Sequence, residues 1–168
     1  YVREIETHQH TRDQTLAFVK AYLKEVSEYL EVPSETKVYI MEKRKPTLDT
    51  KKNRMKSGIH IVVPDICTHK FVEQRVRRNL LKNMSDYFPN LPLTESWDKV
   101  YDEGVANRSV PWTVYGSRKN DPNSLPYLVS YIIQNGQILN NVPQVSKELM
   151  QTLSLCRDES AETPMTEQ

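Results

Sequence analysis

Apolar residues recur at steps of three and four near the start of the chain, which is the period of an amphipathic helix. The stripe consists of Leu16, Val19, Leu23, Val26 and Leu30. It predicts a helix from Arg12 to Leu30. Thr11 precedes this helix and Gln14 follows three residues later, a pair that is typical of a capping box.

A second stripe of the same period predicts a helix from Lys70 to Tyr87, with Thr68 as its N-cap. The two helices are separated by segments rich in β-branched residues, Lys37–Met41 and Gly58–Val63, which are expected to be strands. Because the second segment is almost continuously apolar, we expect it to be buried on both faces.

The second half of the chain is expected to contain short strands, a hairpin and a last helix. The expected elements are strands Lys99–Asp102, Thr113–Tyr115 and Tyr127–Gln134, a partner strand Gln137–Leu139, and a helix Val145–Leu155. Asn135-Gly136 is a strong hairpin signal between the last two strands. Helices mixed with hairpins favour an α+β fold.

The chain has 168 residues, of which 27% are charged and 38% hydrophobic, so it is long enough for one good-sized core. We expect one domain over residues 1–155 and a polar tail or linker over 156–168. No apolar run is long enough to cross a membrane, and no secretion signal precedes the first helix. We therefore expect an intracellular protein with no membrane partner. A start at Tyr1 rather than Met predicts a fragment.

Ser57, Gly58 and His60 bring a hydroxyl and an imidazole to the start of the expected strand. A small turn of this kind binds anions through its backbone N–H groups and its hydroxyl. The alternative is a core strand with one structural histidine.

Asp102 ends another expected strand, a position from which a carboxylate can hold a divalent cation. One carboxylate is a poor metal site, and Asp102-Glu103-Gly104 is equally consistent with a plain turn. The turn at Gly116-Ser117-Arg118-Lys119 carries a hydroxyl and two cations, which suits a triphosphate or a nucleic-acid backbone.

A net charge of +1 says little about partners, because the position of the basic residues decides what they bind. Two clusters of basic residues could neutralise phosphates or could be solvated surface. They are Lys43, Arg44, Lys45, Lys51, Lys52, Arg54 and Lys56 in an expected loop, and Arg75, Arg77 and Arg78 on the second helix.

Four potential zinc ligands, His8, His10, Cys67 and His69, match no standard zinc spacing. The chain also lacks the motifs of P-loop ATPases, α/β-hydrolases and zincin proteases.

The motifs around Ser57-Gly58-Ile59-His60, Tyr101-Asp102-Glu103-Gly104-Val105 and Tyr115-Gly116-Ser117-Arg118-Lys119, together with the strand after them, occur in a characteristic order. Over Tyr1–Ile133 the chain resembles the primase domain of poxvirus-type primase-helicases of large DNA viruses, in the archaeo-eukaryotic primase superfamily. That resemblance implies an RRM-like sheet with packed helices and hairpins.

By the same resemblance, Ser57, His60, Arg118 and Lys119 bind the nucleotide, and His60 and Asp102 are catalytic, with Asp102 on Mg²⁺ or Mn²⁺. Phosphate contacts to nucleic acid are expected from Lys43, Arg44, Lys45, Lys51, Lys52, Arg54, Arg75 and Arg78. The implied partners are a single-stranded DNA template, nucleoside triphosphates and a superfamily 3 helicase domain in the same polypeptide, at a viral replication site.

The first motif of that family, an acid pair of the D-x-D type, is expected upstream of Tyr1. Glu4 and Glu6 have the spacing of such a pair but lack the apolar strand that presents it. Since two-metal phosphoryl transfer needs more than one aspartate, we expect weak or no polymerisation from this chain alone. The alternatives are a catalytically inactive, primase-like nucleic-acid-binding module and a structural protein with coincidental motifs.

Overall fold

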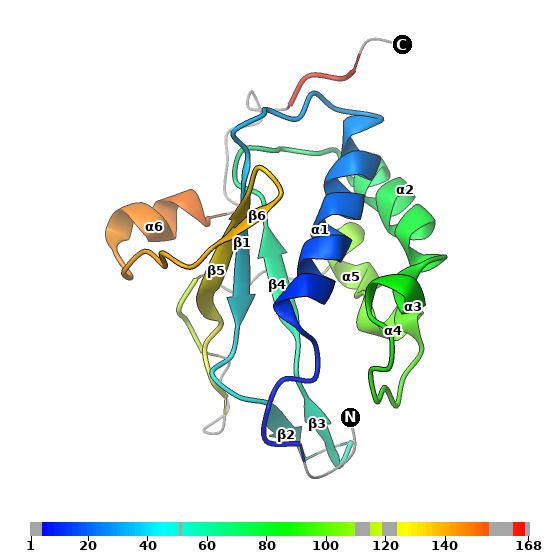
Figure 1. Ribbon diagram of the computed structural model, residues 1–168, viewed down its shortest axis with the longest axis vertical. Helices are drawn as coiled ribbons and strands as arrows, with labels where there is room; N and C mark the ends of the chain where they lie inside the picture. The colour runs from blue at the N-terminus through cyan, green and yellow to red at the C-terminus, as the bar shows by residue number, and fades with distance from the viewer. Residues whose placement is uncertain (1–4, 51, 110–114, 119–123, 155–162, 167–168) are drawn as a thin grey trace.

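A computed structural model describes residues 5–50, 52–109, 115–118, 124–154 and 163–166. An antiparallel sheet of four strands has the order β4-β1-β5-β6, and α1 and α2 lie together on one side of it (Figure 1). The strands are β1 (Lys37–Glu42), β4 (Ile59–Val62), β5 (Leu128–Gln134) and β6 (Gln137–Leu139). Helices mixed with an antiparallel sheet confirm the α+β class.

Helix α1 spans Arg12–Ser27, and its predicted capping box is present. The Gln14 N–H donates to Thr11 Oγ1 at 3.1 Å, and the Thr11 N–H donates to Gln14 Oε1 at 2.9 Å. The helix ends three residues before the predicted Leu30, which instead forms an isolated bridge with Met165. Residues 163–166, part of the expected tail, therefore contact the end of α1, while the domain boundary at residue 155 stays a prediction.

The predicted second helix is divided into α2 (Lys70–Leu81) and α3 (Met84–Tyr87), because Asn83 leaves the helical conformation with a φ of −123°. Its N-cap is His69 rather than Thr68, since His69 Nδ1 accepts from the Phe71 N–H. The Thr68 hydroxyl instead donates to Glu73 at 2.9 Å.

Three hydrophobic clusters hold the layers together. One lies between α1 and the sheet and includes Val19, Val38, Ile40, Tyr131 and Ile133. A second joins α1 to α2 and α3. The third lies on the opposite face of the sheet, where α6 (Lys147–Thr152) contributes Leu149 beside Met41 and Val129.

A bulge in β5 determines which side chains of this strand point to each of the two faces. Tyr131 pairs with Ile40 and Val129 pairs with Met41, which leaves Ser130 as the extra residue. Without the bulge, alternation would place Val129 and Tyr131 on the same face. They instead belong to clusters on opposite faces.

The hairpin signal is confirmed, since Asn135 and Gly136 both have positive φ, 50° and 69°, as a primed turn requires. The expected basic loop is wrong in part. It contains a small hairpin of β2 (Thr47–Asp49) and β3 (Arg54–Lys56). The sequence did not indicate these strands, because most of their paired residues are polar and they are too short to show an apolar pattern.

The predicted strand at Lys99–Asp102 is also wrong, because the backbone there forms α4 (Trp97–Val100) and then α5 (Glu103–Ala106). The expected strand at Thr113–Tyr115 lies outside the described residues except for Tyr115. The expected last helix is α6, which is shorter than predicted at both ends, since Val145 and Ser146 precede it and Leu153 and Ser154 are not helical.

Candidate functional site

The end of β1 at Glu42 brings several of the predicted residues close together. In the ladder Met41 pairs with His60 and Glu42 pairs with Ile59. Because paired residues point to the same face, His60 shares the face of Met41, and Glu42 shares that of Ile59. Ile59 packs against the α1 and α2 clusters, so Glu42 is on the helix-covered face and His60 is on the other.

His60 stacks on Tyr127, with ring centroids 3.6 Å apart and an interplanar angle of 13°. Lys43 Nζ lies 5.4 Å from the centroid of the same tyrosine ring. A Cβ on Gly58 would lie 3.0 Å from Tyr127 Oη, so glycine is what allows the tyrosine to approach the turn. Burial raises the pKa of the Tyr127 phenol. Sequence reasoning missed the role of Tyr127, which the pattern placed only as the first residue of a strand.

Tyr115 anchors the turn at Gly116-Ser117-Arg118 to the same face of the sheet. Its side chain is buried in the cluster of Met41 and Val129, and its hydroxyl accepts from the Val129 N–H at 3.3 Å. Gly116 has a φ of 76°, which favours glycine, and Arg118 is exposed. The described part of the predicted phosphate-binding turn is therefore attached to the face that carries His60. Lys119 lies outside the described residues.

Ser57 is hydrogen-bonded to His8, with 2.6 Å between Ser57 Oγ and His8 Nδ1. The other ring nitrogen, His8 Nε2, lies 2.8 Å from the carbonyl oxygen of Lys43. A carbonyl only accepts, so Nε2 carries a proton, and in the neutral imidazole Nδ1 then accepts from the Ser57 hydroxyl. No local sequence pattern indicates this contact, because 49 residues separate the two side chains.

His10 and Glu42 form a close, mostly buried pair, with His10 Nε2 2.5 Å from Glu42 Oε1 and only 4% and 13% of the side chains exposed. Burial opposes ionisation of Glu42. Hydrogen bonds from His10 and Ser130, and the electrostatic effect of the His10 and His8 imidazoles, nevertheless hold the pKa of Glu42 below its ordinary value. The only sequence signal was the His-x-His spacing of His8 and His10, since Glu42 directly follows the expected strand Lys37–Met41 and begins the expected basic loop.

Asp102 is the N-cap of α5, and its carboxylate accepts from the Gly104 N–H at 2.8 Å. The segment before it is fixed by Arg77, which donates to the Tyr101 carbonyl at 2.9 Å and to Asp98 Oδ1 at 3.0 Å. Arg77 is 7% exposed. Its suggested place in a phosphate-binding cluster is therefore wrong, because its guanidinium holds the loop that leads to Asp102.

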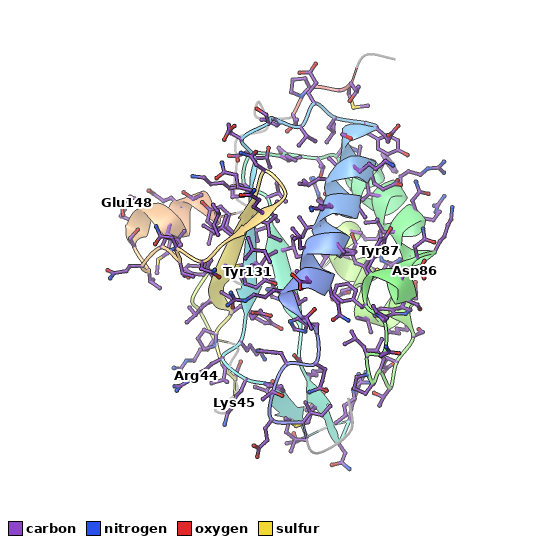
Figure 2. The ribbon with its side chains drawn as sticks, in the orientation of Figure 1. Arg44, Lys45, Asp86, Tyr87, Tyr131 and Glu148 are labelled. Atoms are coloured by element: carbon purple, nitrogen blue, oxygen red, sulfur yellow. The ribbon has the colours of Figure 1, made fainter. Side chains whose placement is uncertain are left out.

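The remaining basic residues divide into paired and exposed ones. Arg54 bonds Glu95, with Lys52 3.8 Å from the same carboxylate, and Lys56 lies 2.7 Å from Asp49. Arg44 and Lys45 are exposed and project from the turn after β1 (Figure 2). Arg75 and Arg78 are exposed on α2, and Lys51 lies outside the described residues.

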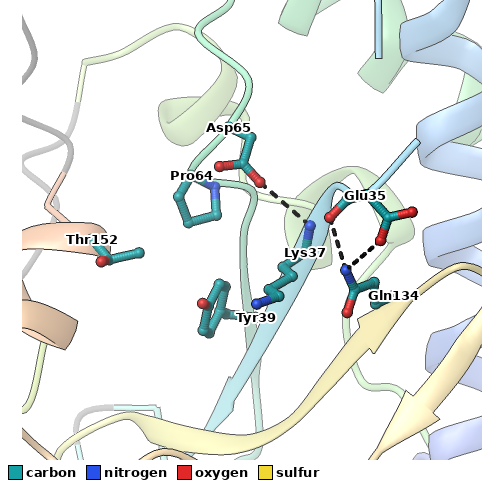
Figure 3. Close-up of a pocket in the computed structure, with 7 residues that line it drawn as sticks. All are labelled: Glu35, Lys37, Tyr39, Pro64, Asp65, Gln134 and Thr152. Carbon is teal, nitrogen blue, oxygen red and sulfur yellow. Dashed lines mark hydrogen bonds between the residues drawn. The ribbon is translucent and has the colours of Figure 1, made fainter. Parts of the chain in front are cut away.

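A cavity of about 460 Å³ lies at the opposite end of β1 (Figure 3). It is lined by Glu35, Lys37, Tyr39, Pro64, Asp65, Gln134 and Thr152. Two pairs of these lining residues are hydrogen-bonded to each other, since the Gln134 side chain donates to the Glu35 carbonyl and the Lys37 N–H donates to Asp65. None of the predicted site residues that the structure describes lines this cavity.

Comparisons with known proteins identify what the chain resembles. The model of the family described as "C962R protein N-terminal AEP domain" matches residues 2–133. A protein of Acanthamoeba polyphaga mimivirus named "Putative helicase L207/L206" is 38% identical over 116 residues, which is 67% of this chain and 12% of the relative. No solved structure matches the chain. Among the described residues, no helix has the length and apolar character needed to cross a lipid bilayer.

Proposed function

Because this chain belongs to the family of C962R-type archaeo-eukaryotic primase (AEP) domains, we propose that it binds the incoming nucleoside triphosphate in a viral DNA primase. In this proposal it is one module of a longer primase-helicase with a superfamily 3 helicase domain, acts on a single-stranded DNA template, and has an RRM-like sheet. The mimivirus relative is named a putative helicase, and the match covers only 12% of its length, which supports a multidomain protein.

The observation that carries the proposal is the shared face of His60 and the Arg118 turn. The Tyr115 side chain and its hydrogen bond to Val129 attach the turn to the face on which His60 stacks against Tyr127. An imidazole on this face and an exposed arginine in the turn that Tyr115 attaches to it suit the charge of a triphosphate, with Lys43 beside Tyr127 as a further cation. In the proposal Ser57 and Lys119 add contacts to the same phosphates.

The metal chemistry of the family places a limit on what this chain does alone. Asp102 offers a carboxylate, one oxygen of which already accepts from Gly104. Among the described residues, no group of three or more potential ligands includes Asp102. Glu6 is exposed, and Glu4 lies outside the described part of the chain. The described residues do not form a two-ion site, so in this proposal Asp102 supplies one ligand position.

Nucleotide affinity tests the proposal. A nucleoside triphosphate is titrated into the chain by calorimetry, with Mg²⁺ present, for the wild type, His60→Ala and His60→Phe. Loss of a charge-assisted hydrogen bond is worth about 1.5–3 kcal/mol, so we expect at least a tenfold weaker affinity. The phenylalanine variant keeps an aromatic ring against Tyr127 and lacks the ring nitrogens.

The two variants separate binding from packing. If His60→Phe binds the triphosphate as tightly as the wild type, His60 is a structural histidine and the proposal fails. His69→Ala, at the exposed cap of α2, is the matched control and is expected to bind normally. Thermal unfolding of every variant verifies that the proteins compared are folded.

A second function, binding single-stranded DNA without catalysis, is favoured by the exposed cations Arg44, Lys45, Arg75 and Arg78. Affinity for an oligonucleotide is measured over a series of salt concentrations. Each lost phosphate contact lowers the log–log salt slope by about 0.7 for a single strand. The double variant Arg44→Ala/Lys45→Ala is expected to flatten the slope, whereas Lys24→Ala on α1 is not; equal slopes for both would exclude this surface.

A further inference from the structure

The side chains of His8, His10 and Glu42 form a compact group on the helix-covered face of the sheet. One potential ligand atom from each lies within 4.8 Å of the others. The two histidines belong to the segment before α1, whereas Glu42 ends β1, 32 residues after His10. Tertiary structure, rather than a local motif, therefore brings two imidazoles and a carboxylate together.

The hydrogen bonds of His8 leave its Nδ1 lone pair as the one able to bind a cation. Nε2 donates to the Lys43 carbonyl at 2.8 Å, and a ring protonated there has its free lone pair on Nδ1. Histidines that bind metals typically donate their second nitrogen to a carbonyl or carboxylate in this way, which fixes tautomer and ring orientation. In the structure, the Ser57 hydroxyl occupies that lone pair.

Glu42 is prepared to act as an anionic ligand. Its side chain is only 13% exposed, and Ser130, the extra residue of the β5 bulge, hydrogen-bonds its carboxylate. A bulge beside a site commonly redirects a side chain toward it. His10 hydrogen-bonds the same carboxylate, with only 4% of its side chain exposed.

The type of ligand selects the type of ion. Two imidazole nitrogens and one carboxylate favour a divalent transition-metal ion, such as Zn²⁺, whereas Mg²⁺ prefers oxygen ligands and retains its waters. Three protein ligands leave a coordination position for water.

We propose that His8 Nδ1, His10 Nε2 and the Glu42 carboxylate bind one divalent transition-metal ion, such as Zn²⁺. The ion fastens residues 5–11 to the end of β1. It lies on the face opposite His60 and is separate from any ion that Asp102 would hold for nucleotidyl transfer. Binding at Nδ1 also releases the Ser57 hydroxyl from His8, and binding at His10 Nε2 replaces the proton that this nitrogen donates to Glu42, which passes to solvent.

The first test is titration of the metal-free chain with Zn²⁺ alone, in competition with a chromophoric chelator, and with Mg²⁺ in parallel. We expect one Zn²⁺ per chain, no competition from millimolar Mg²⁺, and a higher melting temperature with Zn²⁺ present. Co²⁺ serves as a spectroscopic probe, whose visible absorption reports nitrogen and oxygen ligation. Absence of a stoichiometric site, or equal binding of Mg²⁺, overturns the proposal.

Variants identify the ligands. Because loss of even an outer-shell partner costs about 10- to 100-fold in metal affinity, Glu42→Gln and His10→Gln are each expected to weaken Zn²⁺ binding by at least about 100-fold. His69→Ala, which removes an exposed histidine far along the sequence, is expected to bind within about twofold of the wild type. If Glu42→Gln and His10→Gln both bind Zn²⁺ like the wild type, the site is elsewhere.

Ser57→Ala gives a test in the opposite direction. It removes the hydroxyl that competes for His8 Nδ1, so Zn²⁺ should bind about fivefold more tightly. Weaker or unchanged binding would show that Nδ1 is not a ligand. Failure of this metal site leaves the nucleotide proposal intact, because that proposal depends on His60→Phe and on a different face of the sheet.

Discussion

The two faces of the sheet differ sharply at the end where β1 reaches Glu42. On the helix-covered face, Ile40 is fully buried and Glu42 bonds His10 next to it. On the other face, His60 stacks on Tyr127 beside the cation of Lys43. One face is closed by α1 and has its polar groups paired to each other, while the other presents rings and cations.

This difference suggests that adjacent positions at the end of β1 have different roles. Residues 40 and 42 stabilise the fold and tie the segment before α1 to the sheet, whereas residues 41 and 43 lie on the side proposed for the nucleotide. Because side chains alternate in a strand, one short segment supports both roles. Substitutions on the two faces should therefore affect different measurements.

The largest expected effect is on the helix-covered face. Ile40→Ala removes a fully buried side chain next to Val19 and Tyr131 and should lower the free energy of unfolding by about 2–5 kcal/mol. Urea denaturation measures the loss. Leu139→Ala, at a side chain that is 37% exposed and pairs with Ile132 on the other face, is the control and should cost less than about 1 kcal/mol. Similar losses for both would show that the faces do not differ in this way.

A smaller effect is expected from crowding the other face. In Gly58→Ala the new Cβ lies 3.0 Å from Tyr127 Oη, so the tyrosine must move, at a cost of about 1–3 kcal/mol in stability. Triphosphate affinity should fall together with it, because Tyr127 supports His60. Calorimetric titration and thermal unfolding measure the two effects.

The double variant Gly58→Ala/Tyr127→Phe sharpens this test. Removing Oη removes the atom in conflict, so the double variant should be more stable than Gly58→Ala alone, a coupling that a double-mutant cycle quantifies. Additive losses would mean that the contact between Gly58 and Tyr127 does not limit the turn.

The smallest effects compare helix caps on the two faces. Thr11→Ala removes the capping box of α1 and should cost about 1 kcal/mol. Ser146→Ala removes the cap of the short α6 on the other face and is expected to cost about 0.5 kcal/mol. Thermal unfolding of both variants decides the order, and a reversed order would contradict the greater structural weight given to α1.

The parts of the fold that were predictable are those with a local cause. The capping box at Thr11, the hairpin at Asn135-Gly136 and the apolar strand around Ile61 each depend on residues a few positions apart. The start of α2 at Lys70 was predicted correctly, but its cap is His69 rather than Thr68. Errors of this size are ordinary, because several neighbouring residues can cap a helix.

The predicted strand at Lys99–Asp102 was wrong for a different reason. Its apolar and polar residues fit a short strand, but Arg77 donates to the Tyr101 carbonyl and to Asp98, and the backbone folds into α4 and α5. The hydrogen bonds of the buried Arg77 guanidinium reach residues 21 and 24 positions away, so they leave no periodic signal in the sequence. Propensity in a four-residue window is weak enough for such contacts to override it.

The sequence by itself determined the α+β class, the first helix, the central strands and the order of motifs that marks the primase family. Tertiary structure alone decided that His8 meets Ser57, that His10 meets Glu42, and that Tyr127 lies under His60. The physical reason is separation along the chain. Periodicity and capping act over a few residues, whereas these contacts join residues 32 to 67 positions apart and exist only once the sheet has formed.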